Sequence, residues 1–324
     1  MIRHLVWLLA AACASQPAPQ KPSPPPAAPS PPRAVDFAYD ASQPLDVQLE
    51  GTPDAWGDIE IQRLTYASPR GGRVTALVVA PHAVSGRRPA VIFQHGMGLL
   101  DKTELLPDAI LVARAGGIAL LVDAPDQRPE ALRTLDYASH EHDDELWEHT
   151  AVDLRRAVDV LAARPDVDAE HLGFVGHSFG ASQGAILAGI EPRIHAFVLV
   201  GAGDFTRGIR EGQTEALVGL RKKVPPPALA GFLSSMEVFD ATRYLGKAPA
   251  TAAVLLQFGA YDAGTSQRAD DELAAASTAR TTTRRYPTGH FITSVAAARD
   301  RIEFLADELH LPTRDAIARE LARQ

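Results

Sequence analysis

A Gly-x-Ser-x-Gly motif at residues 176–180 places a serine where it could act as a nucleophile. The apolar residues 172–175 before it indicate a buried strand, and the small residues 181–188 after it are typical of a helix. A tight strand-to-helix turn exposes a serine hydroxyl at the edge of a sheet, and flanking glycines relieve crowding there. We therefore predict Ser178 as a nucleophile; the alternative is a glycine-rich turn with an idle serine.

The segments around this motif alternate between apolar runs and helical patterns, which favours βαβ units and a mainly parallel sheet. Strands are predicted at 73–80, 90–94, 118–122, 172–175, 196–200 and 253–258, with a short one at 281–285. Helices are predicted at 104–114, 146–163, 266–278, 291–309 and 314–323. No internal repeat interrupts this order, so we predict one domain over residues 35–324.

Residues 164–168 (Arg-Pro-Asp-Val-Asp) and 172–181 (Leu-Gly-Phe-Val-Gly-His-Ser-Phe-Gly-Ala) resemble the α/β-hydrolase superfamily. The chain is most similar to its dienelactone-hydrolase-like and prolyl-oligopeptidase-like esterases, from about residue 73 to residue 290. This resemblance implies an α/β-hydrolase fold, with a mainly parallel central sheet and helices on both faces. It also implies a Ser–His–Asp triad in the chain order serine, acid, histidine.

Three histidines follow the serine, at positions 195, 290 and 310. His290 lies in a loop between the strand predicted at 281–285 and the last long helix, where this fold presents its general base. The first of the other two precedes a strand and the last lies near a helix end. We therefore predict His290 as the base, the alternative being an exposed loop histidine.

The acid of the triad is assigned from the same resemblance. Asp262 ends a Gly-x-x-Asp turn after an apolar strand, which is similar to the turn that supplies the family's carboxylate. The residues that follow, 263–266 (Ala-Gly-Thr-Ser), depart from the apolar residue and proline often found there. Asp204, after the preceding strand, is a rival position. The acid holds the imidazole in one tautomer and offsets the imidazolium that forms.

Residues 95–98 (His-Gly-Met-Gly) follow a predicted strand and resemble the family's His-Gly-x-Gly loop. The resemblance assigns one oxyanion donor to the Met97 N–H and the other to the Phe179 N–H, next to the nucleophile. Two such donors stabilise a tetrahedral intermediate. His95 and His177 are expected to be structural supports. The alternative for this loop is a glycine-rich turn without a catalytic part.

Two further segments could shape a site. Residues 140–144 (His-Glu-His-Asp-Asp), with His149, lack a recognisable metal-ligand spacing, so we expect a solvated helix start and no metal or organic cofactor. Residues 205–240 lie between two core strands and are predicted to form a small cap. Its apolar residues either face an acyl or alcohol pocket or bury themselves.

The N-terminus is typical of an exported protein. Residues 1–14 combine a short positive start, an apolar stretch and small residues before Cys13, and resemble a bacterial lipoprotein signal in which that cysteine is lipidated. The alternatives are a secretory signal cut after Ala12 or Ala14 and a chance apolar start. Residues 15–34 form a proline-rich linker, for which a tether is expected. The lipoprotein interpretation places the protein in the cell envelope, at the outer membrane or in the periplasm; the alternative is a soluble secreted protein.

Charge and cysteine content exclude several classes. Lys and Arg number 32 against 40 Asp and Glu, a formal net charge of −8, and no basic run stands out, which argues against nucleic-acid binding. Cys13 is the single cysteine, so an internal disulfide and a cysteine nucleophile in the folded body are excluded.

These features together predict a serine hydrolase of carboxylic esters that works through an acyl-enzyme, with a small-molecule ester as its substrate. A peptidase of short peptides is the alternative within hydrolases, although no propeller domain that would restrict its substrates is visible in the sequence. A non-catalytic binding protein on the same scaffold is the alternative from another class.

Overall fold

The computed structural model describes residues 35–82, 86–98, 100–128 and 141–312. The predicted signal segment with Cys13, the whole proline-rich linker that ends at residue 34, His140 and the helix predicted at 314–323 lie outside these residues. In the part described, no helix is both long and apolar enough to cross a membrane.

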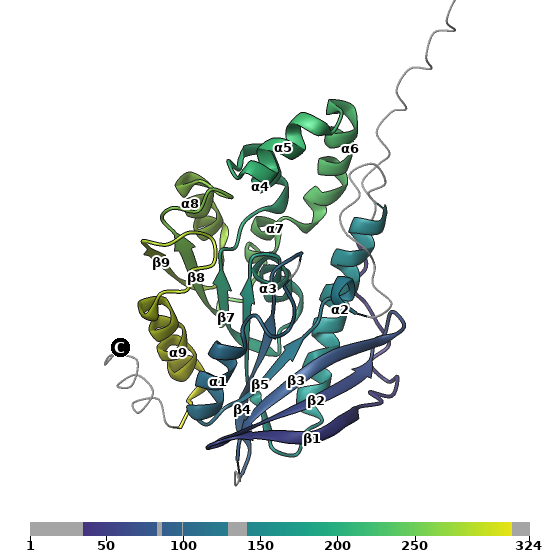
Figure 1. Ribbon diagram of the computed structural model, residues 1–324, viewed down its shortest axis with the longest axis vertical. Coiled ribbons are helices and arrows are strands. Elements are labelled where there is room, and N and C mark those ends of the chain that lie inside the picture. The colour runs from purple at the N-terminus through teal and green to yellow at the C-terminus, as the bar shows by residue number, and fades with distance from the viewer. Residues whose placement is uncertain (1–34, 83–85, 99, 129–140, 313–324) are drawn as a thin grey trace, which may run out of the picture. The chain divides into compact units, whose positions relative to one another are not determined.

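One mixed sheet runs through the described residues, in the strand order β1-β2-β3-β5-β4-β6-β7-β8-β9 (Figure 1). The pairs from β5 through β9 are parallel, whereas β1, β2 and β3 pair antiparallel and β3 is antiparallel to β5. This is the mainly parallel sheet that the sequence predicts. The strands are β1 (Gln48–Trp56), β2 (Ile59–Ala67), β3 (Arg73–Pro81), β4 (Arg88–Gln94), β5 (Ile118–Val122), β6 (Val167–His177), β7 (Ile194–Val200), β8 (Ala253–Gly259) and β9 (Arg280–Tyr286).

Helices cover both faces of the sheet. Two of them, α1 and α9, pack against one face, and α2, α3, α7 and α8 pack against the other. Residues 205–240, where the sequence predicts an insertion, form α4, α5 and α6, which lie together at the top of Figure 1. The helices are α1 (Leu106–Arg114), α2 (Glu141–Ala162), α3 (Phe179–Ile190), α4 (Phe205–Glu211), α5 (Glu215–Lys223), α6 (Pro226–Met236), α7 (Ala241–Leu245), α8 (Gln267–Ala276) and α9 (Val295–Leu309).

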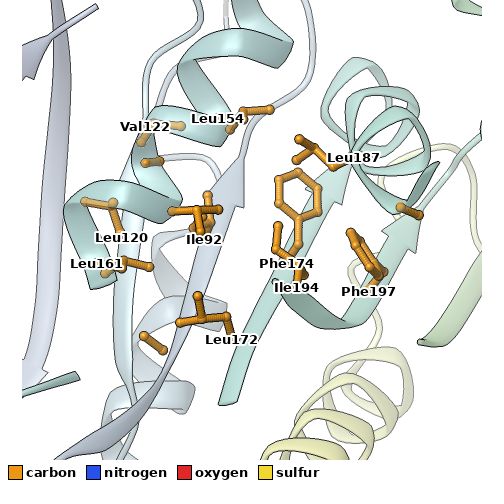
Figure 2. Close-up of a cluster of buried hydrophobic side chains, with 14 of the residues drawn as sticks. Ile92, Leu120, Val122, Leu154, Leu161, Leu172, Phe174, Leu187, Ile194 and Phe197 are labelled. Atoms are coloured by element: carbon orange, nitrogen blue, oxygen red, sulfur yellow. The ribbon is translucent and has the colours of Figure 1, made fainter. Parts of the chain in front are cut away.

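The central strands are buried on both faces because their side chains alternate across the sheet. In β4, Val91 and Phe93 face α1 and α9, whereas Ile92 packs with Phe174 of β6 on the other side. Figure 2 shows this second layer, in which Leu154 of α2 lies over the strands. Burial on both faces explains why these strands appear in the sequence as continuous apolar runs.

The strand β1 forms one edge of the sheet, and all nine of its residues are exposed. Its pairing with β2 shifts register between Glu50 and Asp54, a bulge that contains Pro53. Neither β1 nor β2 is among the predicted strands. A strand exposed on both faces has no need of alternating apolar residues, so the sequence carries little signal for it.

Two expectations about helices are wrong. The last long helix begins at Val295 rather than at residue 291, because Ser294 caps it by accepting from the Ala297 N–H at 3.2 Å. The start of α2 is not solvated: Asp143 and Asp144 are buried, and His149 lies 2.9 Å from the Ser68 hydroxyl. The first half of α2 packs through Trp147 and Ala151 against α3 and α6, whereas its second half packs on the sheet, so the start of the helix is covered as well.

Candidate active site

Ser178 lies on the turn between β6 and α3, with a backbone φ of 52° and ψ of −112°. A positive φ is rare outside glycine, costs of order 1–3 kcal/mol and persists only where the surrounding structure fixes it. The Ser178 N–H donates to the Val200 carbonyl of β7 at 2.8 Å, which ties the turn to the neighbouring strand. The predicted strand–turn–helix around Ser178 is confirmed.

The two glycines of the motif are required by close backbone approach. A Cβ at Gly176 would lie 2.2 Å from the Gly180 carbonyl oxygen. A Cβ at Gly180 would lie 2.1 Å from the Gln94 carbonyl oxygen of β4. Real side chains do not tolerate these distances, so any larger residue at either position displaces the turn that carries Ser178.

His290 and Asp262 meet at the carboxyl ends of β8 and β9. The Nδ1 atom of His290 lies 2.6 Å from Oδ2 of Asp262, whose side chain is only 2% exposed. The other carboxylate oxygen accepts the Gly264 N–H at 2.7 Å. A carboxylate on Nδ1 favours the tautomer that keeps the lone pair on Nε2. The sequence-predicted acid and base are thus brought together, with Nε2 able to accept a proton.

Burial raises the pKa of Asp262, but the hydrogen bond and charge of His290 and the Gly264 N–H outweigh it. The pKa of this carboxyl therefore lies below its ordinary value, and the group is ionised at neutral pH. An ionised, buried carboxylate is suited to stabilising a positive charge on the imidazole.

The rival acid, Asp204, is engaged elsewhere. Its carboxylate accepts the backbone N–H and the hydroxyl of Thr242 at 2.9 and 3.0 Å. Asp204 lines the same cavity as Ser178, but its carboxylate is hydrogen-bonded to α7, the helix that contains Thr242. The geometry favours Asp262 over Asp204 as the partner of His290.

The loop after β4 is held by buried side chains. His95 Nε2 accepts the Ala124 N–H at 3.0 Å, so Nδ1 carries the proton and donates to the Gly96 carbonyl at 2.6 Å. The peptide bond between Gly96 and Met97 is trans and planar. The Met97 N–H therefore points in the opposite direction to the Gly96 carbonyl, away from His95. A Cβ on Gly96 would lie 3.5 Å from the Cβ of Ser178, so the loop runs beside the predicted nucleophile.

Phe179 opens α3, and the N–H groups of the first helical turn have no acceptor within the helix. Met97 and Phe179 line one cavity together with Ser178, Asp262 and His290. All five residues predicted for the site in the folded domain therefore lie around a single cavity.

That cavity has a volume of about 490 Å³ and a largely apolar wall. Trp147 of α2 makes an edge contact there with Phe179 and a tilted contact with Phe205, at ring distances of 5.0 and 5.1 Å. Arg207 is paired with Glu211 at 3.1 Å and also with Glu272. The apolar lining residues are Met97, Trp147, Phe179, Ala202, Phe205, Ile209, Ala216, Leu217, Ala269 and Phe291.

No group of three or more His, Cys, Asp or Glu residues suited to a metal ion occurs in the described ranges. The candidate cluster at 140–144 is only partly covered by those ranges. Within it, Asp143 and Asp144 are buried near the start of α2, and His149 lies 3.3 Å from Asp153.

One contributor to the site was not predicted: Gly201, with φ of 63°, lies where a Cβ would be 3.3 Å from Cε1 of the His290 ring. His177, expected to be a structural support, contacts the loop of the predicted base, with its Nε2 3.2 Å from the His290 carbonyl oxygen. The positive φ of Gly201 leaves no mark in the sequence beyond the glycine itself, so only the fold could reveal its place.

The acetyl xylan esterase (AXE1) family model matches residues 38–215. This span includes Met97, Ser178 and Phe179 but ends before Asp262 and His290. No curated protein matches the chain.

Solved structures share the fold at low sequence identity. Acetyl xylan esterase from Paenibacillus sp. R4 is 20% identical, with a TM-score of 0.67, covering 82% of this chain and 90% of its own. Acetyl xylan esterase 1 from Thermoanaerobacterium sp. JW/SL YS485 is 18% identical, with a TM-score of 0.66, covering 82% and 89%. A prolyl endopeptidase structure, 16% identical with a TM-score of 0.57, covers 78% of this chain and 39% of its own.

The predicted α/β-hydrolase fold is thus confirmed, and the family match covers more than half of the sequence. The chain belongs to the acetyl xylan esterase (AXE1) family of the α/β-hydrolases.

Proposed function

We propose that this AXE1-family hydrolase cleaves carboxylic esters with Ser178 as nucleophile, His290 as general base and Asp262 as the acid that orients it. The observation that carries the proposal is the 2.6 Å contact between His290 Nδ1 and Asp262, on the cavity that Ser178 also lines. The strained backbone of Ser178 supports it, because such strain clusters at functional sites.

The reaction proceeds in two halves. Ser178 Oγ attacks the ester carbonyl while His290 Nε2 takes its proton, and the imidazolium then gives that proton to the departing alkoxide. Water, deprotonated by the same nitrogen, attacks the acyl-enzyme, and Ser178 leaves with the proton returned. The Met97 and Phe179 N–H groups donate to the oxyanion in both tetrahedral intermediates.

The cavity wall favours an ester with an apolar group larger than acetyl. A volume of about 490 Å³ lies in the range of sites for drug-sized ligands, of order 300–1,000 Å³. The charged side chains on the wall already have partners: Arg207 pairs with Glu211, and Asp204 binds Thr242. A sugar would need several free polar partners there, whereas an alkyl or aryl group needs none.

Turnover of p-nitrophenyl butyrate by purified protein tests the mechanism. Ser178→Ala should lower kcat by several orders of magnitude while the protein stays folded, because the triad acts as a unit. Ser182→Ala is the matched control. Its hydroxyl lines the same cavity but donates to the Gly203 carbonyl at 3.1 Å, so its loss should cost at most about tenfold. A Ser178→Ala protein with wild-type turnover would reject the mechanism, and preference for a peptide p-nitroanilide would favour a peptidase.

We also propose that the protein is exported and anchored in the cell envelope through a lipid on Cys13. The apolar residues before this cysteine and the proline-rich segment after it support the proposal.

A further inference from the structure

Glu104, just before α1, joins two parts of the site that are far apart in the sequence. One carboxylate oxygen, Oε2, accepts the Gly96 N–H at 2.7 Å. The other, Oε1, lies 2.5 Å from Nδ1 of His177, the residue before Ser178. The side chains of Glu104 and His177 are 12% and 2% exposed, so water does little to weaken this contact.

His177 continues the chain of contacts to the base loop. Its Nε2 lies 3.2 Å from the His290 carbonyl oxygen, and its ring lies 5.2 Å from the ring of Phe291. A carbonyl oxygen can only accept, so Nε2 donates to it, while Nδ1 lies against the Glu104 carboxylate.

The charge on Glu104 agrees with this pairing. Burial raises the pKa of Glu104, but the hydrogen bond and charge of His177 and the Gly96 N–H outweigh it, so its pKa lies below its ordinary value.

The Gly96 residue is consequently held on both sides. Its N–H is bound by Glu104 and its carbonyl by His95 Nδ1. With these two groups fixed, the direction of the following Met97 N–H is set before any substrate arrives. An oxyanion donor works by being held in place in advance, so this arrangement bears on rate rather than on substrate affinity.

We infer that Glu104 and His177 are positioning residues, which hold the Met97 N–H and the His290 loop in place for the acyl transfer. This inference rests on the proposed function. If so, Glu104 and His177 do not contact the substrate themselves. Their substitution should change kcat through Met97 and His290, which do contact it.

Two variants of Glu104 separate geometry from simple stability. Glu104→Ala removes both contacts and should lower kcat about 100-fold, the order of loss for one oxyanion donor, with KM changing less than about threefold. Glu104→Gln keeps an amide oxygen for the Gly96 N–H and an amide N–H that faces His177. It should stay within about tenfold of wild type.

Inhibition by phenylboronic acid provides a readout that a merely structural role would not move. Its tetrahedral serine adduct places an oxygen at the oxyanion position, so its inhibition constant should rise in Glu104→Ala by a factor similar to the loss in kcat. Adding His177→Asn to Glu104→Ala should cost no more than about threefold further, because residues in one network are not additive.

The control is Glu191→Gln. Glu191 is also a buried carboxylate in ion pairs, with Arg155 and Arg193, but lies at the far end of α3 from Ser178. It should lower the melting temperature and leave kcat per folded molecule unchanged. If Glu104→Ala fails to fold, His177→Asn alone takes its place in the same assays.

Several results would overturn the inference while the wild type remains active. These are an unchanged kcat in Glu104→Ala, a loss confined to KM, an unchanged phenylboronic acid constant, or a Glu104→Gln enzyme as impaired as Glu104→Ala. A wild type without Ser178-dependent turnover is a different result: it would reject the proposed function, and this inference with it.

Discussion

Asp204 and Asp240 cap each other's helices. Asp204 directly precedes α4, yet its carboxylate accepts the N–H and hydroxyl of Thr242 in α7. Asp240 directly precedes α7, yet it accepts the N–H and hydroxyl of Thr206 in α4 at 3.1 and 2.7 Å. The two aspartates thereby close the base of the insertion formed by residues 205–240.

Because Asp204 is engaged in this crossed capping, substituting Asp204 and substituting Asp262 should have different effects on catalysis. Asp262→Asn should lower kcat by about 10⁴, because the amide favours the wrong tautomer of His290. Asp204→Asn should cost about tenfold or less, since its carboxylate binds Thr242 rather than the imidazole. Steady-state kinetics of both variants with one ester checks this. The opposite order would move the acid to Asp204.

The stability of the fold should depend on the ionisation of Asp240. Burial, together with the charges of Asp204 and Glu237, raises its pKa from 3.8 to about 6, against the bonds from Thr206. The folded protein therefore holds this proton more tightly than the unfolded chain. The contribution to stability is complete below about pH 4 and is lost as the pH rises through about 6, by up to about 3 kcal/mol.

Asp240→Asn should remove this dependence of the free energy of unfolding on pH. Urea unfolding at pH 4.5 and pH 7 measures it: the variant should gain stability relative to wild type at the higher pH. An equal difference between wild type and variant at both values would contradict the assignment.

Gly201 is predicted to set the position of the His290 ring. A Cβ there would lie 3.2 Å from the His290 carbonyl oxygen and 3.3 Å from Cε1, at a φ of 63° that side chains disfavour. Gly201→Ala should lower kcat about tenfold or more and cost about 1 kcal/mol of stability. Gly203→Ala is the matched control, because its Cβ would meet nothing within 4 Å. Equal kinetics for the two variants would show that the ring tolerates displacement.

The apolar cavity predicts a preference among acyl chains. For p-nitrophenyl esters from acetate to octanoate, kcat/KM should rise through the first added carbons, by about fourfold for each fully buried CH₂. Ile209→Asp, which places a charge on the cavity wall, should flatten the series. If the wild type prefers acetate, the prediction is wrong, and its substrates would instead be acetyl esters, as in the name of its family.

Membrane association tests the proposal for Cys13. Expressed in a bacterium, the full-length protein should fractionate with membranes, and Cys13→Ser should release or mislocalise it. Immunoblots of the membrane and soluble fractions provide the measurement. Equal association of both forms would refute the lipid anchor.

The nucleophile turn could be predicted because its determinants are local. The glycines on either side of Ser178 are spaced for one tight turn, and the buried strand before it is a continuous apolar run. His290 and Asp262 are predicted from the resemblance to the α/β-hydrolases, and the two residues follow β9 and β8, parallel strands that end at one edge of the sheet. The catalytic roles of all three stay predictions.

Other features depend on packing between distant segments. Glu104 and His177 meet only because the loop after β4 folds over the end of β6, and neither lies in a pattern that pairs them. The crossed capping of Asp204 and Asp240 is similar, because each residue alone predicts only a cap for its own helix. The exposed strand β1 lacks the alternation on which strand prediction depends.

The bulge in β1 bears on how the protein behaves at high concentration. An exposed edge strand offers backbone groups to which a strand of another molecule can add, and this is a common start of aggregation. Pro53 has no N–H to offer, and the register shift between Glu50 and Asp54 bends the edge where a flat ladder would otherwise continue. The irregularity of this strand thus protects the molecule from polymerising along its own sheet, and a variant that straightens it would be expected to precipitate on storage.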